Sequence, residues 1–289
     1  MKLGKYYISF EDNPDIFFDD AVFIDDDSHN PSVPYLIWQH ELLAFPVQIA
    51  QWGLNLVNRY IRGESELKGD IIEIADFAIE NDSTDEKGRL FWDMSVYRPK
   101  YNLESPWKSA MANGEMISFL LRAYEIENND SYLETARKAL EIMEIPVEDG
   151  GVVGKFPDGS PTLEEYPSIP YSNVLNGMIF AILGIYDYSV FFGENKKLFE
   201  IFAESIAQNL ARYDNGIWSK YDLFKGGMTS SRIYQWLHSE QLEALARLYP
   251  LWESEYLKYA TKWRRYSNSF ICNSLRNLFR VREKIFKGF

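Results

Sequence analysis

The sequence predicts a mainly α fold in which helical hairpins close into a toroid, with short β-strands and β-hairpins between them. Three observations support this prediction. Pairs of helical segments recur roughly every fifty to sixty residues, a period typical of stacked helix pairs. Short strand-like or glycine-rich segments separate the pairs. The most unusual polar residues fall in the loops between pairs or at helix starts, which favours a ring with one shared mouth over an extended solenoid.

The composition describes a globular chain that can bury a large core. It has 289 residues, of which 46% are hydrophobic and 25% charged, so it forms one large domain or two ordinary ones. A single cysteine, Cys272, excludes an internal disulfide framework and a cysteine-rich zinc site. Aromatic residues reach 16%, and Trp and Tyr outside helix cores can line sugar-binding grooves.

The net charge of −13 restricts the class of partner. It argues against nucleic acid, because phosphate binding needs a positive surface. A polyanionic ligand would have to meet a local cationic groove. The N-terminus lacks the apolar run of a signal peptide, and we read no uninterrupted apolar stretch as long enough to cross a bilayer, so a cytoplasmic location is expected.

Residues 1–34 are acidic and irregular, and we expect an extended arm lying on the main body. The main body, residues 35–266, begins with a helical pattern in which Pro46 either starts or kinks the helix. Apolar residues at three- and four-residue spacing predict the helix pairs 40–62 with 64–80, 108–126 with 131–143, 172–192 with 196–213, and 230–248 with 251–265.

Short β-segments are expected between these pairs. Residues 90–97 alternate like a strand, and VVGKF (152–156) reads as another. The Gly- and Asp-containing turn 213–223 predicts a small hairpin.

The C-terminal segment, residues 267–289, differs in composition from the body. Its apolar residues alternate with basic ones in the pattern of an amphipathic helix. Two interpretations stay open: contact with an anionic membrane surface, or a final helix packed on the acidic body. The basic residues are Arg276, Arg280, Arg282, Lys284 and Lys287.

The stretch LEEYPSIPYSNVLNG (163–177) concentrates groups suited to proton transfer. It places Glu164, Glu165 and Tyr166 on a segment that prolines keep out of a helix. We expect Ser172 or Asn173 to cap the long apolar helix that follows. For an isolated EEYP, a surface turn whose acids face water would be the favoured interpretation.

Two further segments carry polar groups in apolar surroundings. Tyr221 ends the turn at 218–222, and Tyr234, His238 and Gln241 share one helix face because they are four and three residues apart. Such a face is also typical of ordinary core packing. The histidines show no HExxH spacing, so no metal site is predicted, and no GxSxG or P-loop motif is present. Acid–base chemistry by Glu and Tyr remains.

Five blocks of the chain resemble, in order, the C-terminal domain of the D-glucuronyl C5-epimerases that act on heparosan. The resemblance covers about residues 35–266 and implies an incomplete (α/α) toroid. The blocks are PVQIAQWGL (46–54), SPWKSAMANGEMISFLLRAY (105–124), EEYPSIPYSNVLNGMIFAILGIYDY (164–188), SKYDL (219–223) and YQWLHSEQL (234–242).

The resemblance implies inversion of C5 in D-glucuronate residues of a polysaccharide, giving L-iduronate, with no redox cofactor. Glu165 and Tyr234 match the groups that exchange protons on opposite faces of the sugar ring. Tyr166 and Tyr221 match tyrosines that assist or orient.

Candidate substrate-binding residues come from the same blocks and from local charge. Within the matching blocks they are Gln48, Trp107, Asn176, His238 and Gln241. Chosen from local position alone, to balance a sugar carboxylate, are Arg98, Lys155, Lys220 and Arg232. The chain departs from the family where Ile233 and Gln235 flank Tyr234 in place of Asp and His, and the β-rich N-terminal domain of the animal enzymes is missing.

The expected partner is a glucuronate-containing polysaccharide or oligosaccharide, and both a homodimer and peripheral membrane contact through the C-terminal segment stay open. A uronate lyase or a glycoside hydrolase on the same fold is the first alternative function. A lyase shares the C5 proton abstraction and then expels the C4 substituent, whereas a hydrolase needs paired acids across the cleft. A glycan-binding protein without catalysis is the second alternative.

Overall fold

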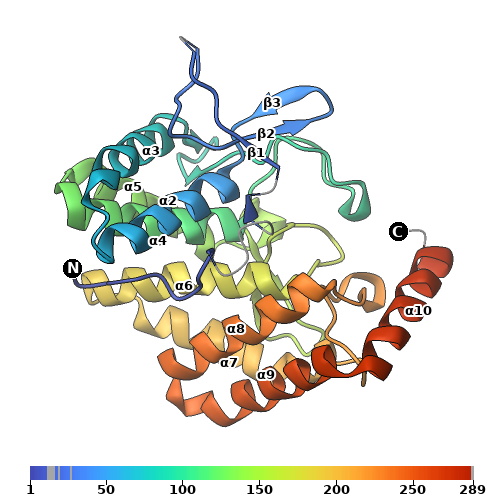
Figure 1. The fold of residues 1–289 in the computed structure, drawn as a ribbon. Helices are drawn as coiled ribbons and strands as arrows, with labels where there is room; N and C mark the ends of the chain where they lie inside the picture. Colours follow the sequence, from blue (N-terminus) through green and yellow to red (C-terminus); the bar gives the residue numbers. More distant parts are fainter. Residues whose placement is uncertain (12–16, 19, 27, 288–289) are drawn as a thin grey trace.

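A computed structural model shows that the fold is mainly α, as the sequence predicts (Figure 1). It describes residues 1–11, 17–18, 20–26 and 28–287. The main body is built of helix pairs in which the two members of each pair pack on each other. The pairs are α2 (Pro46–Ile61) with α3 (Lys68–Glu80), α4 (Ala110–Glu127) with α5 (Asp130–Glu141), α6 (Leu175–Phe192) with α7 (Lys196–Asn209), and α8 (Arg232–Leu248) with α9 (Glu253–Asn268).

The first helices of the four pairs follow one another in space. α2 packs on α4, α4 on α6, and α6 on α8, so these four helices form a continuous row. The arrangement of the pairs as an incomplete toroid stays a prediction.

Helix α6 lies at the centre of this arrangement and is apolar around most of its circumference. It contacts α4, α7 and α8, which explains why nearly every residue from Leu175 to Ile185 is buried. By length and composition α6 is also long and apolar enough to cross a membrane, contrary to our expectation that no segment would be. A helix that other helices cover on several sides has apolar residues around its whole circumference because no side faces water, and the same holds for a membrane-spanning helix.

Short antiparallel strands precede the first helix pair and lie between the first three pairs along the chain. β1 (Ala21–Val22), β2 (Tyr35–Trp38) and β3 (Glu41–Leu43) form one small sheet in that order. β4 (Ser83–Thr84) pairs with β5 (Leu90–Phe91), and β6 (Val153–Lys155) pairs with β7 (Pro161–Leu163).

Several boundaries differ from the sequence prediction. The first helix starts at Pro46, the first of the two alternatives, because residues 41–43 pair with β2 and proline suits the first helical position. Of the predicted strand 90–97, only residues 90–91 pair with a neighbour as a strand. The turn 213–223 closes through a single bridge, Asp214 to Ser219, instead of a strand ladder.

The N-terminal arm is anchored to the body by polar contacts as well as by aromatic packing. The Arg122 guanidinium pairs with Asp187 and donates from Nε to the Gly4 carbonyl at 2.9 Å. The Tyr7 hydroxyl donates to Asp187 Oδ1 at 2.6 Å, and Phe10 is buried in the core. The arm therefore enters the packing of α4 and α6.

The C-terminal segment forms helix α10 (Phe270–Lys287), which packs against α9. Its side chains are described for residues 270–281 and for Glu283. The predicted basic residues Arg282, Lys284 and Lys287 have side chains outside this description, as do residues 288–289 altogether.

Candidate active site

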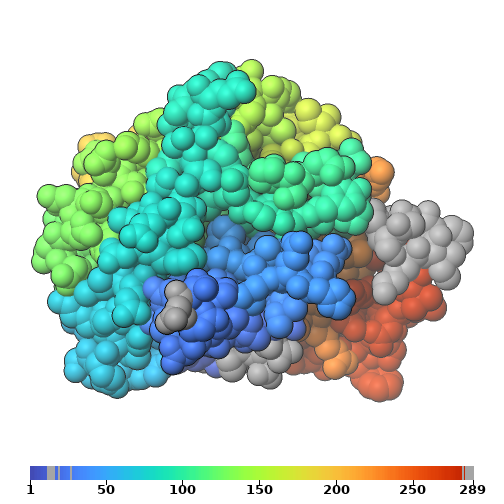
Figure 2. All heavy atoms as spheres, turned by 90° about the horizontal axis from the view of Figure 1, so that it is seen from above, coloured from blue at the N-terminus to red at the C-terminus, as the bar shows by residue number. Residues whose placement is uncertain are grey.

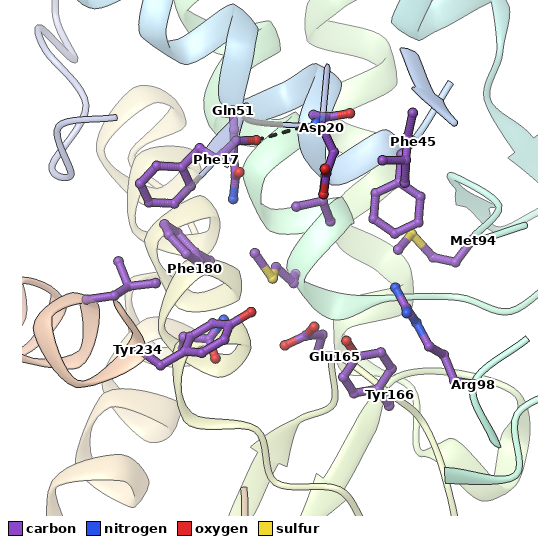
Figure 3. A pocket seen from close by; sticks show the side chains of 16 residues that line it. Phe17, Asp20, Phe45, Gln51, Met94, Arg98, Glu165, Tyr166, Phe180 and Tyr234 are labelled. Atoms are coloured by element: carbon purple, nitrogen blue, oxygen red, sulfur yellow. Dashed lines mark hydrogen bonds between the residues drawn. The ribbon is translucent and has the colours of Figure 1, made fainter. Parts of the chain in front are cut away.

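A cavity of about 300 Å³ opens where the first helices of the four pairs meet the loops between pairs. It is lined by α2, α4, α6 and α8, by the loop that follows β5, and by the segment after β7 (Figure 3). Phe17 and Asp20 of the arm line it too. On the surface above, residues around β2 and β3 lie beside the loop that follows β5 (Figure 2).

Glu165 presents its carboxyl to this cavity. Its side chain is only 8% exposed, and Oε2 has no hydrogen-bond partner among the described residues. Burial raises the pKa of Glu165 to about 7, while the neighbouring Tyr166 phenol and the Arg98 charge oppose the rise. A carboxyl with a pKa near neutral pH is suited to act as a general base.

Gly177 makes room for this acid. A Cβ on Gly177 would lie 2.4 Å from Glu165 Oε2 and 2.6 Å from Glu165 Cβ. Any side chain at this position of α6 would therefore force Glu165 out of its place.

Glu164, one residue earlier, points away from the cavity into a polar cradle. Its Oε2 accepts hydrogen bonds from the Ser172 amide at 2.8 Å, the Ser172 hydroxyl at 2.6 Å and the Asn173 amide at 2.9 Å. Its Oε1 accepts from the Thr162 hydroxyl at 2.6 Å and from Asn173 Nδ2 at 2.9 Å.

This cradle explains why the predicted helix cap at Ser172 or Asn173 is wrong. Both side chains are engaged by Glu164, so α6 begins later, with Val174 as the residue before its first turn and no side-chain cap. The first helical amide, that of Leu175, donates instead to the Tyr221 carbonyl at 3.1 Å. The contact brings the Tyr221 turn to the start of α6.

Tyr166 is held against the cavity wall by aromatic stacking. Its ring stacks on Tyr101 with centroids 4.4 Å apart and contacts Trp107 at 5.2 Å. The Tyr101 hydroxyl donates to buried Asp222 at 2.7 Å, and Lys100 also pairs with that carboxylate. Asp222 thereby fixes the position of the Tyr101 ring on which Tyr166 stacks.

Tyr234 lines the same cavity, and in Figure 3 Glu165 lies between Tyr234 on one side and Tyr166 and Arg98 on the other. It sits in the first turn of α8, whose start is capped by the Ser231 hydroxyl accepting from the Tyr234 amide. Its ring meets that of Tyr221 edge-on at 4.7 Å. Burial and the Glu165 charge raise the pKa of Tyr234 to about 12, so the phenol keeps its proton at neutral pH.

Arg98 supplies a positive charge beside Glu165 and Tyr166. Its guanidinium lies over the rings of Trp38, Phe45 and Tyr166 at 5.4, 6.0 and 5.9 Å. Within the described part of the chain Arg98 forms no ion pair, and its buried Nε has no hydrogen-bond partner there. A half-buried cation held by aromatic faces is suited to bind an anionic group.

Gln48 and Asn176 add unpaired acceptors to the lining. Gln48 Oε1 and Asn176 Oδ1 are buried and lack a hydrogen-bond partner among the described residues. Buried polar atoms are nearly always paired, so several unpaired ones around one cavity indicate a polar ligand.

The structure therefore brings Glu165, Tyr166, Tyr234, Gln48, Arg98 and Asn176 together at one cavity, with Tyr221 directly behind Tyr234. The other candidates lie elsewhere. His238 is fully buried, its Nδ1 is 2.9 Å from the Ser219 hydroxyl, and burial lowers the pKa of its ring to about 3. Gln241 is also fully buried and donates to the Asn176 carbonyl at 3.0 Å.

Trp107 borders the site only through Tyr166, with its indole donating to the Val96 carbonyl. The Lys220 backbone forms an antiparallel β-bridge with Thr229, in the turn behind Tyr221. The side chains of Arg232 and Lys155 are exposed. Gln235, which follows Tyr234, is hydrogen-bonded to the turn that contains Tyr221. Its Oε1 accepts from the Ser219 amide at 2.7 Å.

The sequence reasoning missed several lining residues. Phe17 and Asp20 come from the arm, where no periodicity marks them. Gln51 lies three residues after Gln48, which places both on one face of α2 and could have revealed it. Gln51 Nε2 donates at 2.9 Å to buried Glu115, and burial raises the pKa of Glu115 well above its usual range.

The arrangement combines a base with a pKa near 7, a protonated phenol lining the same cavity, and a cation beside aromatic rings. Among the described residues, no three His, Cys, Asp or Glu side chains are grouped to hold a metal ion. Proton transfer to and from a bound polar, anionic molecule is the chemistry that these groups can perform.

Comparison with known proteins adds independent information. A family profile described as D-glucuronyl C5-epimerase C-terminus matches residues 85–265. The chain is 32% identical over 238 residues to a D-glucuronyl C5-epimerase of Caenorhabditis elegans, covering 73% of this chain and 38% of that protein. It is 32% identical over 220 residues to an uncharacterized protein of Methanocaldococcus jannaschii, covering 71% of this chain and 67% of that protein. The chain thus spans well under half the length of the nematode enzyme.

Proposed function

The chain belongs to the D-glucuronyl C5-epimerase C-terminal family, and from this premise we propose that it is a polysaccharide epimerase. In this proposal it converts D-glucuronate to L-iduronate within a heparosan-like glycan. Proton removal from C5 and proton return to the opposite ring face together invert this one carbon.

The first chemical demand is a base close to an anionic sugar. The C5 hydrogen is α to a carboxylate, so its removal adds negative charge to an already anionic group. Glu165 suits this task because its pKa of about 7 leaves it ionised above neutral pH, yet more basic than an ordinary carboxylate.

The second demand is an acid on the opposite ring face. Tyr234 lines the same cavity as Glu165 and keeps its proton because its pKa is about 12. The C–H bond electrons pass into the carboxylate, and the electron pair then returns to take the phenolic proton at C5. The reverse reaction exchanges the two roles, with Tyr221 and Tyr166 orienting the two groups.

The third demand is stabilisation of the charge that develops on the carboxylate. Arg98 lies beside both Glu165 and Tyr166 and has an unpaired buried Nε, so it can bind the sugar carboxylate. The unpaired oxygens of Gln48 and Asn176 can accept hydrogen bonds from sugar hydroxyls.

A single observation carries the proposal: Glu165, Tyr234 and Arg98 line the same cavity, and in Figure 3 Glu165 lies between Tyr234 and Arg98. The test is incubation of desulfated glucuronate polymer in deuterated water, followed by NMR at C5. Deuterium at C5 together with an iduronate signal is expected. No exchange with any glucuronate polymer would overturn the proposal and favour glycan binding without catalysis.

A hydrolase is the second candidate because the cavity holds another acid. Glu164 is fully engaged in its cradle, but Asp20 of the arm lines the cavity together with Glu165. Two acids on one cavity meet the general requirement of glycoside hydrolysis. The same NMR experiment separates the outcomes: new reducing ends indicate a hydrolase, and unsaturated uronate ends indicate a lyase.

A further inference from the structure

Helix α10 exposes its apolar residues to solvent. Phe270, Ile271, Leu278 and Val281 are 85%, 68%, 64% and 56% exposed, and Leu275 is partly exposed as well. At 3.6 residues per turn these five positions fall within an arc of about 140°. They form an apolar face, which we call the α10 face, on a helix that lies at the edge of the molecule in Figure 1.

Two polar residues of α10, Arg276 and Glu283, contact the protein. The Arg276 guanidinium lies over the Trp218 ring at 5.4 Å. Glu283 accepts from the Thr229 amide at 2.9 Å and from the Thr229 hydroxyl at 3.0 Å. These contacts fix the rotation of the helix, so the outward direction of the α10 face follows from bonding on its other side.

Charge is distributed very unevenly between this segment and the rest of the chain. Residues 267–289 contain five Lys and Arg and one Glu, a net charge of +4, which leaves −17 on residues 1–266. An anionic surface would therefore attract this segment and repel the body.

We propose that the α10 face binds an anionic lipid surface. Amphipathic helices bind such surfaces by burying an apolar stripe among the lipids while nearby cations meet the headgroups. A two-fold pairing of α10 with α10 of a second copy is disfavoured, because it would bring two segments of net charge +4 together.

The test is co-sedimentation of the full chain with vesicles made of equal parts phosphatidylserine and phosphatidylcholine, and with vesicles of phosphatidylcholine alone. The wild type is expected to bind the first and to bind the second weakly. The double variant Ile271→Glu/Leu278→Glu should lower the partition constant at least about tenfold, because two apolar side chains no longer enter the lipid.

A matched control comes from elsewhere on the surface. Ile201→Glu/Leu251→Glu changes the same residue types, at positions 39% and 76% exposed, and adds the same charge. It should bind as the wild type does. Equal loss in both double variants would attribute binding to net charge alone and overturn the proposal.

Two other results would also overturn it. One is absence of wild-type binding to the phosphatidylserine vesicles. The other is a wild-type dimer, measured by light scattering, that the α10 variant converts to a monomer without any change in vesicle binding. Unchanged melting temperatures of both double variants establish that the fold is intact.

Discussion

Glu164 and Glu165 are neighbours in the chain and are both buried, yet their surroundings are opposite. Five hydrogen bonds from Thr162, Ser172 and Asn173 converge on the Glu164 carboxylate. Glu165 faces a cavity, and its Oε2 has no partner among the described residues. The first acid organises backbone, and the second is available to a ligand.

The difference teaches that burial alone does not identify a catalytic acid. Burial raises the pKa of both carboxyls. Hydrogen bonds from Ser172, Thr162 and the Asn173 amide oppose that rise in Glu164, and the Tyr166 phenol and the Arg98 charge oppose it in Glu165. The two acids differ in that both Glu164 oxygens accept hydrogen bonds from the protein, whereas Glu165 Oε2 is left for a substrate.

The largest effect is expected from Glu165→Gln. An amide cannot act as a general base, so C5 exchange should fall by at least ~100-fold. Tyr234→Phe should give a loss of similar size. The measurement is the rate of deuterium incorporation at C5 under saturating polymer. Rates near wild type in both variants would remove these residues from the mechanism.

The stability of Glu165→Gln sharpens the same comparison. Because the folded-state pKa of Glu165 is raised to about 7, the folded protein binds this proton more tightly than the unfolded chain. Its contribution to stability is therefore present below about pH 4.5 and is lost as pH rises through 7. Above pH 7 the glutamine variant should unfold at the same temperature as the wild type or a higher one.

Glu164→Gln should act on stability instead of chemistry. The amide replaces one acceptor oxygen with a donor in a cradle of donors, so the unfolding free energy should fall by ~1–3 kcal/mol. Denaturant titration measures this loss. Exchange at C5 should stay within about tenfold of wild type at low temperature, because the cavity groups are retained. Unchanged stability with abolished exchange would reverse the roles of the two acids.

The smallest effect is on the pH dependence of the wild type. The kcat/KM for deuterium exchange at C5 should rise with pH and level off above about pH 7, as Glu165 loses its proton. In Arg98→Gln the midpoint should move to higher pH, because the Arg98 charge lowers the pKa of Glu165. A midpoint that Arg98→Gln leaves unchanged would place the titrating group elsewhere.

Much of the fold could be predicted because helix pairing depends on local apolar spacing. The three- and four-residue spacing of apolar residues in 64–80 predicted a helix, and Ile71, Ile74, Ala75 and Ala78 form the buried face of α3. The cap of α6 could not be predicted this way, because Glu164 takes up Ser172 and Asn173 from outside the helix. Local rules fail where a distant or extended segment competes for the same polar group.

The candidate site shows the same division. Glu165, Tyr166 and Tyr234 could be named from motifs, but the sequence gives no local sign that Glu164 and Glu165 point in different directions. Asp20 reaches the cavity from the arm, a contact that depends on tertiary packing alone. The orientation of the acids and the contribution of the arm both required the three-dimensional structure.

The close approach of Gly177 to Glu165 has a consequence for any redesign or distant comparison of this chain. The acid and a helix side chain compete for one small volume, which holds only one of them. A sequence with a bulkier residue at this turn of α6 must have moved or abandoned its acid. The residue type at position 177 therefore indicates, from sequence alone, whether a glutamate side chain can occupy the position that the proposed reaction requires.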